Sequence, residues 1–277
     1  MRGLEPDRRT GSQTAVRRIF LLLLLTAPRL FAANVTPLLA AHAHNDYEHA
    51  RPLAEALERG FCSVEADVWL VDGRLLVAHE LKDAKTPRTL GALYLEPLRA
   101  RVRANGGRIF PGGPTVVLLV DVKSEAKATY AALHEELKNY AEMLTAFRAG
   151  RVESGAVSVI VSGNRAVTEM AAQPVRYAAV DGRSADLDAN PPVALVPLVS
   201  ENWQKLFTWR WEGSMPGAER EALRRWVSRA HTQGRKVRFW NTPDRPAAWQ
   251  VLRDAGVDLI GTDDLTGLQK FLLPAGP

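Results

Sequence analysis

The feature that most constrains the fold is a regular alternation of short apolar runs with longer amphipathic stretches. Helical periodicity is clear in four of these stretches, Pro52–Arg59, Glu125–Met143, Ala218–Thr232 and Pro246–Ala255. Eight apolar runs have the length of β-strands: Leu38–His42, Cys62–Val68, Thr115–Val122, Val157–Val161, Val175–Val180, Ala194–Val199, Lys236–Trp240 and Val257–Gly261. Such alternation predicts parallel strands joined by helices. A (β/α)8 barrel takes about 250 residues, so the 277-residue chain predicts a single α/β domain of the TIM-barrel type.

Two segments depart from the pattern of a regular barrel. Asp72-Gly73 separates two apolar runs and predicts a β-hairpin with a tight turn after the second strand. The link Arg183–Pro192 is too short for a full helix, and its last two residues are prolines, which disfavour a helix. We therefore expect a somewhat irregular barrel.

The first 33 residues have the composition of an export signal. Arg17-Arg18 precede the apolar run Ile19–Ala27, and the small residues Ala32-Ala33 follow. These features are typical of a secretory signal peptide, and the paired arginines also suit the twin-arginine route. The run is too short to span a bilayer, which takes about 20 residues. We expect residues 1–33 to be a removable signal peptide and residues 34–277 to be a secreted or periplasmic mature domain.

The net charge of +5 is concentrated in this leader, whose six arginines and two acidic residues give it +4. The rest of the chain carries only +1, which argues against nucleic acid as a partner. We expect a small-molecule or lipid substrate, a monomeric mature protein, and at most transient contact with a membrane surface. The single cysteine, Cys62, excludes an intramolecular disulfide and a zinc site built from several thiolates.

Polar residues recur where the early strands end. Alternate residues of a strand share one face, and the active sites of TIM barrels lie at the C-terminal ends of the strands. We therefore expect these polar side chains to converge at the barrel mouth. They are His42-x-His44 after the first strand, Glu65-x-Asp67 in the second, His79 after the hairpin, and Asp121-x-Lys123 in the third.

The three carboxylates of this group predict a metal site. Glu65, Asp67 and Asp121 would repel one another unless a cation lay among them. A few hard oxygen ligands, with room left for water and substrate oxygens, suit Mg²⁺ or Ca²⁺ better than zinc. The sequence therefore predicts a divalent cation, Mg²⁺ or Ca²⁺, as the cofactor.

Histidines beside such an ion indicate acid–base or nucleophilic chemistry on a phosphate ester. One imidazole would attack or take a proton, and the other would protonate the leaving oxygen, while the metal offsets the phosphate charge. Lys123, on the same face as Asp121, would hold a phosphate oxygen. His79 is one member of the pair, and His42 and His44 remain alternatives for the other.

Taken in order, these residues resemble the PLC-like phosphodiesterase superfamily, which includes glycerophosphodiester phosphodiesterases and sphingomyelinase D-type phospholipases. The resemblance covers nearly all of residues 38–265. It is carried by His44, Glu65-Ala66-Asp67, His79-Glu80, Asp121-Val122-Lys123 and Phe239-Trp240-Asn241. The superfamily implies a phosphoric diester hydrolase on an irregular TIM-type barrel.

Within this superfamily, the chain is similar to the family of altered inheritance of mitochondria protein 6 and its bacterial relatives. The likeness is carried by His44-Asn45-Asp46-Tyr47, by residues 63–69 and by residues 88–95. Asn45 stands where glycerophosphodiester phosphodiesterases have an arginine that helps to hold phosphate, so the substrate remains either a glycerophosphodiester or a phospholipid. Hydrolysis and cyclic-phosphate formation also remain open. The resemblance implies that His44 and His79 are catalytic, that Glu65, Asp67 and Asp121 bind the metal, and that Lys123, Asn45 and Trp240 contact the substrate.

Two alternatives compete with this interpretation. In amidohydrolase-type barrels the first strand ends in His-x-His, as His42-Ala43-His44 does, but further metal-binding histidines are needed on later strands, and none of the five later predicted strands has one. The other alternative is a secreted binding module with a decayed active site. The presence of both histidines, all three carboxylates and Lys123 argues against it.

Overall fold

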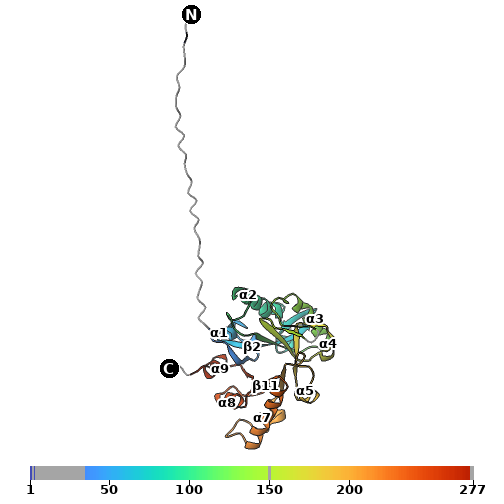
Figure 1. The fold of residues 1–277 in the computed structure, drawn as a ribbon, viewed down its shortest axis with the longest axis vertical. Coiled ribbons are helices and arrows are strands. Elements are labelled where there is room, and N and C mark those ends of the chain that lie inside the picture. Colours follow the sequence, from blue (N-terminus) through green and yellow to red (C-terminus); the bar gives the residue numbers. More distant parts are fainter. Residues whose placement is uncertain (2, 4–34, 149–150, 275–277) are drawn as a thin grey trace. The chain divides into compact units, whose positions relative to one another are not determined.

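Eight parallel strands close into a ring in the computed structural model, which describes residues 1, 3, 35–148 and 151–274. Each strand pairs with the next, and the last strand pairs with the first, so the predicted TIM-type barrel is confirmed (Figure 1). In ring order the strands are β1 (Leu38–Ala43), β2 (Phe61–Val71), β4 (Val116–Val122), β7 (Val157–Gly163), β9 (Ala178–Gly182), β10 (Leu198–Asn202), β11 (Lys236–Trp240) and β12 (Leu259–Thr262).

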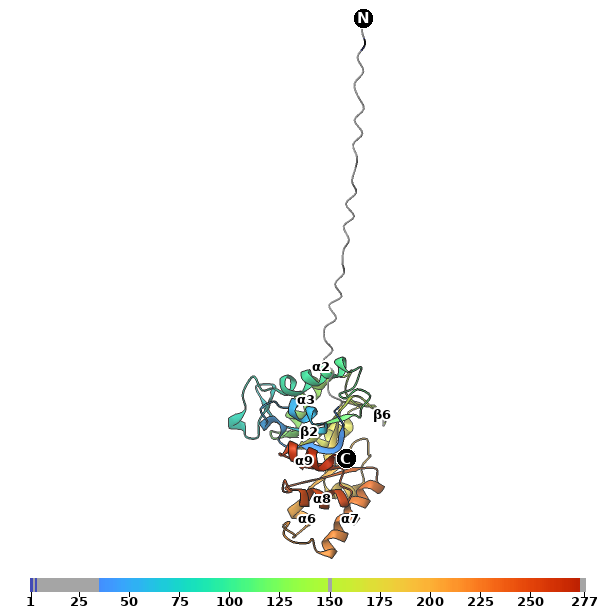
Figure 2. The ribbon, with the colours of Figure 1, turned by 90° about the vertical axis from the view of Figure 1, so that its left-hand side faces the viewer.

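Helices follow most of the strands and pack on the outside of the ring. In both views, α2 and α3 lie on one side of the strands and α7 and α8 on the opposite side (Figures 1 and 2). None of the described helices combines the length and the apolar character needed to cross a membrane. The helices are α1 (Ala54–Glu58), α2 (Glu96–Ala104), α3 (Ala126–Lys138), α4 (Val167–Ala172), α5 (Ser184–Ala189), α6 (Trp203–Leu206), α7 (Gly217–Thr232), α8 (Pro246–Asp254) and α9 (Leu265–Leu272).

The predicted hairpin is present and projects beyond the barrel mouth. Strand β2 continues past the ring and pairs antiparallel with β3 (Arg74–Val77). The turn residues Asp72 and Gly73 have φ angles of 48° and 74°. Two consecutive residues in the left-handed region are what a two-residue hairpin turn requires. The hairpin leads directly to His79, which it holds over the carboxyl ends of the strands.

Two predicted strands enter the barrel sheet several residues after their predicted first residues. Val175 and Arg176 form β8, which pairs with β5 (Ala146–Arg148) in a separate antiparallel sheet completed by β6 (Arg151–Glu153). The Arg176 guanidinium lies 4.4 Å from the ring centre of Phe147, which holds β8 in that sheet. The predicted strand Ala194–Val199 begins only at Leu198, because the N–H groups of Leu195 and Val196 donate to the Pro192 carbonyl and Pro197 has no N–H for the ladder. The link Arg183–Pro192 contains only the short α5, as its length predicts.

The barrel interior is layered, and this layering positions the site. Leu119, Ile160, Leu198 and Leu259 form a buried apolar cluster from four of the barrel strands. Asp121 and Ser162 each lie two residues beyond a member of this cluster, so they face the interior one layer nearer the mouth. Cys62 is a free, buried residue of β2. Apolar side chains therefore form a floor beneath a polar layer at the carboxyl ends of the strands.

Candidate active site

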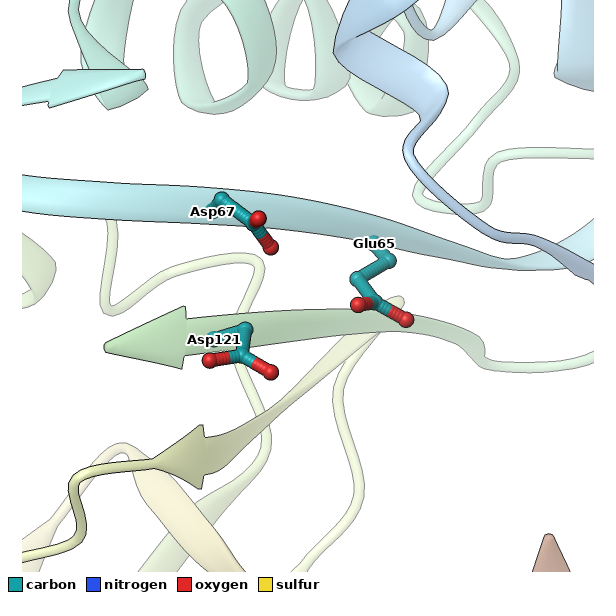
Figure 3. Close-up of side chains that lie close together, drawn as sticks. All are labelled: Glu65, Asp67 and Asp121. Carbon is teal, nitrogen blue, oxygen red and sulfur yellow. The ribbon is translucent and has the colours of Figure 1, made fainter. Parts of the chain in front are cut away.

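The three predicted metal-binding carboxylates meet inside the barrel mouth. Figure 3 shows Glu65 and Asp67 extending from β2 toward Asp121 on β4. One oxygen atom from each residue lies within 4.8 Å of the others. Asp67 and Asp121 are paired in the sheet register, and Glu65 pairs with Leu119, one layer deeper. The spacing Glu-x-Asp therefore brings two acidic groups to the same interior face, and the parallel neighbour supplies the third.

Glu65 is held in its ionised form by two buried partners. Its Oε2 atom lies 2.9 Å from His42 Nε2 and accepts a 2.5 Å hydrogen bond from the Arg238 guanidinium. Burial alone would raise the pKa of Glu65, but the charge of Arg238 and the hydrogen bond from His42 outweigh it and lower the pKa. Arg238 was not predicted from the sequence. The one sequence feature that could have indicated Arg238 is its position on β11, two residues before Trp240.

Asp67 is surrounded by hydrogen-bond partners on one oxygen only. Its Oδ2 atom accepts from the Tyr47 hydroxyl at 2.8 Å and lies 3.0 Å from His79 Nδ1 and 3.1 Å from Lys123 Nζ. Its Oδ1 atom is buried without a hydrogen-bond partner. Burial raises the pKa of Asp67, and the charge of Lys123 offsets part of that rise. An unpartnered buried carboxylate oxygen is costly unless another group satisfies it.

Asp121 shares the Lys123 ammonium with Asp67, at 3.2 Å from its own Oδ1 atom. Burial raises the pKa of Asp121 to about 6, although the charge of Lys123 opposes the rise. Burial lowers the pKa of Lys123, but the two carboxylates outweigh it and raise the pKa overall. Lys123 therefore stays cationic beside the acidic group, where a quarter of its side chain remains exposed to the cavity.

This donor set fits a divalent cation. Asp67, whose Oδ1 has no hydrogen-bond partner, belongs to the only cluster of three or more potential metal ligands found among the described residues, and that cluster holds no histidine. Hard carboxylate oxygens of this kind suit Mg²⁺ or Ca²⁺. The all-oxygen set also differs from the histidine-rich arrangement of an amidohydrolase, because His42 of the His-x-His pair is bonded to Ser63 and Glu65 instead.

Gly163 makes room for Asp121. It follows Ser162 at the end of β7 with a φ of +66°, and a Cβ atom there would lie 2.2 Å from Asp121 Oδ1 and 2.4 Å from the Val122 carbonyl oxygen. Real Cβ atoms do not approach that closely. Either Asp121 or the end of β4 would have to shift to accept a side chain. Gly163 is therefore required for the position of the Asp121 carboxylate, and this contact could not be predicted from the sequence.

We expect Gly163→Ala to lower the Mg²⁺ affinity of the protein by about tenfold or more, because a displaced ligand loses geometry that the ion requires. Isothermal titration calorimetry measures this directly. Gly73→Ala is the matched control, since Gly73 also has a positive φ but no atom within 4 Å of the added Cβ. Equal affinities for the two variants would contradict the steric role of Gly163.

The two candidate catalytic histidines are each held by a carboxylate. His44 follows β1, and its Nδ1 atom lies 2.8 Å from Asp263 Oδ1, just beyond β12. Burial lowers the pKa of His44, but the hydrogen bond to Asp263 and the charge of Glu65 outweigh it and raise the pKa. His79 makes the corresponding contact to Asp67, and its side chain is 55% exposed. His44 Nε2 has no hydrogen-bond partner among the described residues, and His79 Nε2 lies 4.0 Å from Glu80 Oε1, beyond hydrogen-bond distance, so each histidine has its Nε2 available to a substrate.

Burial separates His42 from His44. His42 is completely buried, and both of its ring nitrogens are bonded, one to Ser63 at 2.7 Å and the other to Glu65 at 2.9 Å. Burial and the charge of Arg238 lower its pKa to about 4, so it stays neutral. His44, by contrast, lines the cavity and has 38% of its side chain exposed. Of the two alternatives, only His44 is accessible to a substrate.

The site opens into a cavity of about 430 Å³, which adjoins a second lobe of about 200 Å³. His44, Arg238 and Trp240 line both parts. Trp240 is 38% exposed, and Asn45, in the left-handed region with a φ of 46°, also faces the larger part. The cavity therefore contains every site residue predicted from the sequence except Asp67, which lies just behind His79 and Lys123.

The loop that carries His44 and Asn45 is anchored by a buried acid. Asp46 Oδ2 accepts from the Leu53 N–H at 2.5 Å and from the Tyr94 hydroxyl at 2.9 Å. Leu53 has a φ of 62°, unusual for a branched residue. Burial raises the pKa of Asp46 to about 6, although these hydrogen bonds oppose the rise.

This shift predicts a pH-dependent stability cost. Between about pH 4 and pH 6 the folded protein keeps the Asp46 proton while the unfolded chain has lost it, so the stability contributed by this group falls as the pH rises through that window. The fall should be about 3 kcal/mol. Asp46→Asn cannot titrate, so urea denaturation should show the variant gaining stability relative to the parent from pH 4 to pH 6. A difference between the two proteins that does not change with pH would contradict this account.

Comparison with known proteins places these features in a family. The model of the AIM6-like phosphodiesterase domain matches residues 29–180, and the glycerophosphoryl diester phosphodiesterase family matches residues 236–266. The chain is 31% identical to altered inheritance of mitochondria protein 6 of Eremothecium gossypii, over 86% of this chain and 70% of that protein. It is 26% identical to a homologue from Arthroderma benhamiae, over 83% of this chain and 82% of that protein.

Solved structures share the fold at low sequence identity. A glycerophosphodiester phosphodiesterase from Parabacteroides distasonis superposes with a TM-score of 0.52 at 16% identity, over 84% of this chain and 96% of that one. A phosphodiesterase from Oleispira antarctica, solved with its product sn-glycerol-3-phosphate, gives the same TM-score, identity and coverage. Since one family model covers more than half of the chain, and relatives align along most of its length, the chain belongs to the AIM6-like phosphodiesterase domain family.

Proposed function

We propose that this chain is a metal-dependent phosphoric diester hydrolase that acts by acid–base catalysis through His44 and His79. The observation that carries the proposal is the meeting of two accessible histidines with a cluster of three carboxylates at one barrel mouth. Each histidine presents Nε2 while a carboxylate holds its Nδ1. This arrangement lets one histidine take a proton from the attacking group while the other donates a proton to the leaving oxygen of a bound ester.

The charges of the site favour a diester over a monoester. The three carboxylates face two buried or half-buried cations, Arg238 and Lys123, so these five groups carry a net charge of −1. A divalent cation would change this to +1, which a phosphodiester monoanion neutralises. A phosphomonoester dianion would leave an excess negative charge in a partly buried site, which is unfavourable.

The chain's own residues have separable tasks in this mechanism. Asp263 orients His44 and stabilises its imidazolium form, and Asp67 orients His79. One imidazole takes the proton of the attacking group, and the other protonates the leaving oxygen. Lys123, on the cavity wall, can hold a non-bridging phosphate oxygen as a point charge. A divalent ion bound by Glu65, Asp67 and Asp121 would supply neutralisation of the phosphoryl charge.

The same cavity supports a glycerophosphodiester or phospholipid as the substrate class. Trp240 offers an exposed indole face, and Asn45 offers an amide in the position next to His44. The Asn45 Oδ1 atom lies 2.8 Å from the Tyr47 hydroxyl, whose single proton also faces Asp67, and the Asn45 NH2 group is available to donate to a substrate oxygen. An uncharged donor there replaces an arginine, so the cations left to attract the phosphate are those that line the cavity, Lys123, Arg183 and Arg238.

A substrate screen tests the proposed activity. Aryl phosphodiesters, glycerophosphodiesters and lysophospholipids would be compared with an aryl phosphomonoester, in Mg²⁺ or Ca²⁺, with product analysis to distinguish hydrolysis from cyclic-phosphate formation. We expect turnover of diesters and none of the monoester. Metal binding without turnover of any diester would instead support a non-catalytic binding module.

We further propose that the protein is exported and that residues 1–33 are removed. This segment falls outside the described residues except for Met1 and Gly3, so the proposal rests on its sequence alone. The intact mass of the exported protein should correspond to an N-terminus between Ala32 and Val35. A full-length chain in the cytoplasm would contradict the proposal.

A further inference from the structure

A second cavity, of about 340 Å³, lies outside the active site. Its lining residues come from α7, from the region of α8, and from the segment 207–216 between α6 and α7. The helices α7 and α8 lie near each other in both views (Figures 1 and 2). None of its lining residues contributes to the two lobes of the active-site cavity. Its volume falls within the range of small-molecule binding sites.

The walls of this cavity are aromatic and apolar. Trp209 and Trp211 line it from the segment 207–216, and Leu223 and Val251 line it from α7 and α8. Ala247, an exposed residue in the first turn of α8, stands at its rim. Two indoles lining one small cavity give it an aromatic surface that suits a ring better than a bare aliphatic chain.

The aromatic walls are held in place rather than loosely packed. The Trp211 ring lies 4.3 Å from that of Trp203 and 4.8 Å from that of Trp209. The Trp209 backbone N–H donates to Glu219 on α7 at 3.0 Å. Trp211 has a φ of 69°, a conformation that costs a bulky residue free energy and persists only where the surroundings enforce it. Strain of this kind in a fixed loop is a feature of binding sites.

The polar groups of the cavity favour an anion. Arg220 and Arg224 line it from α7, and Asp254 is the one carboxylate among the lining residues. Arg224 Nη1 pairs with Glu221 on the same helix at 3.1 Å, so Arg220 is the principal cation of the cavity. The Asp254 Oδ1 atom already accepts from the Gln250 amide. Arg220 Nη2 donates to the Met215 carbonyl, which fixes the guanidinium, yet Arg220 forms no ion pair within the described part of the chain. A guanidinium with free donors beside an apolar wall is suited to a carboxylate or sulfonate.

We propose that this cavity is a second binding site and that it takes a small aromatic anion. The ring packs against Trp209 and Trp211, and the anionic group pairs with Arg220 and Arg224. The site is independent of the proposed phosphodiesterase activity, because the two share no residue. Its loss would leave the metal cluster and the catalytic histidines unchanged.

Calorimetric titration of the full chain with naphthoate tests this site. We expect saturable one-to-one binding, about tenfold tighter than that of the uncharged naphthalenemethanol, since one charged contact contributes about a factor of ten. Arg220→Gln should weaken naphthoate binding by about tenfold. Arg225→Gln is the matched control, because Arg225 is an exposed neighbour on α7 that does not line the cavity.

Two further variants locate the ligand. Ala247→Phe should abolish binding, because the exposed rim position lets the new ring enter the cavity without disturbing the core. His44→Ala should leave naphthoate binding unchanged, which separates this cavity from the active site. The proposal would be overturned by the absence of saturable binding, by binding that survives Ala247→Phe, or by equal losses in the two arginine variants. Tighter binding of decanoate than of naphthoate would overturn the aromatic class of the ligand.

Discussion

His44→Ala and His79→Ala are each expected to lower kcat by about 10²-fold or more on any phosphodiester that the protein hydrolyses. Each change removes one of the two imidazoles that line the cavity, so one proton transfer loses its side chain. Steady-state kinetics at saturating Mg²⁺ measures the effect. Because His44 depends on Asp263 for its orientation and raised pKa, Asp263→Asn should also reduce kcat, by less than the loss of the ring itself.

Other histidines provide controls for this result. His134 lies between the rings of Tyr130 and Tyr177, and His231 is bonded to Asp258, both outside the cavity. Alanine at either position should leave kcat nearly unchanged. His42→Ala is different, because it frees Glu65 from a buried partner; we expect it to reduce stability and metal affinity together. A loss of kcat in the His42 variant as large as in the His44 variant, with metal affinity intact, would contradict the assignment of His44.

Asp67→Asn is expected to lower Mg²⁺ affinity by at least tenfold and kcat by about 10²-fold, because Asp67 supplies both the unpartnered oxygen and the support of His79. In the absence of metal, Asp67→Asn should not destabilise the folded protein. Burial already disfavours the Asp67 carboxylate, so the neutral amide should be no less stable than the parent in EDTA.

Thermal unfolding with and without Mg²⁺ checks this pair of effects. Mg²⁺ should raise the Tm of the parent and have little effect on that of the Asp67 variant, since a ligand stabilises only the state that binds it. Asp188→Asn is the control, because this exposed carboxylate pairs with Arg229 away from the site. An undiminished Mg²⁺ shift in the Asp67 variant would exclude Asp67 as a metal ligand.

The sequence was sufficient to predict the barrel and the centre of the candidate site. Both follow from short-range patterns: the alternation of strands and helices sets the fold, and the i, i+2 pairs Glu65-x-Asp67 and Asp121-x-Lys123 share interior faces. The structure brings these residues to one cavity mouth, as expected. The strand boundaries were less predictable, because the pairing of Arg176 with a separate sheet depends on Phe147, nearly thirty residues away.

The supporting residues could not be predicted, because their partners are distant in the sequence. Arg238 meets Glu65 across 173 positions, and Asp263 meets His44 across 219, through the closure of the barrel. Arg238 lies in the middle of β11 and Asp263 lies just beyond β12, and neither position shows from the sequence which partner it will meet. Gly163 depends on the approach of the neighbouring strand, which only the folded backbone defines.

The most direct test of the proposed function is the titration of metal-free protein with Mg²⁺ while the hydrolysis of an aryl phosphodiester is followed. We expect no turnover in EDTA, and a saturable return of activity over the same Mg²⁺ concentrations at which calorimetry detects binding, with both lost together in Asp67→Asn. Undiminished hydrolysis by the demetallated protein would contradict the metal-dependent mechanism, and saturable Mg²⁺ binding without turnover of any phosphodiester would contradict the enzymatic one.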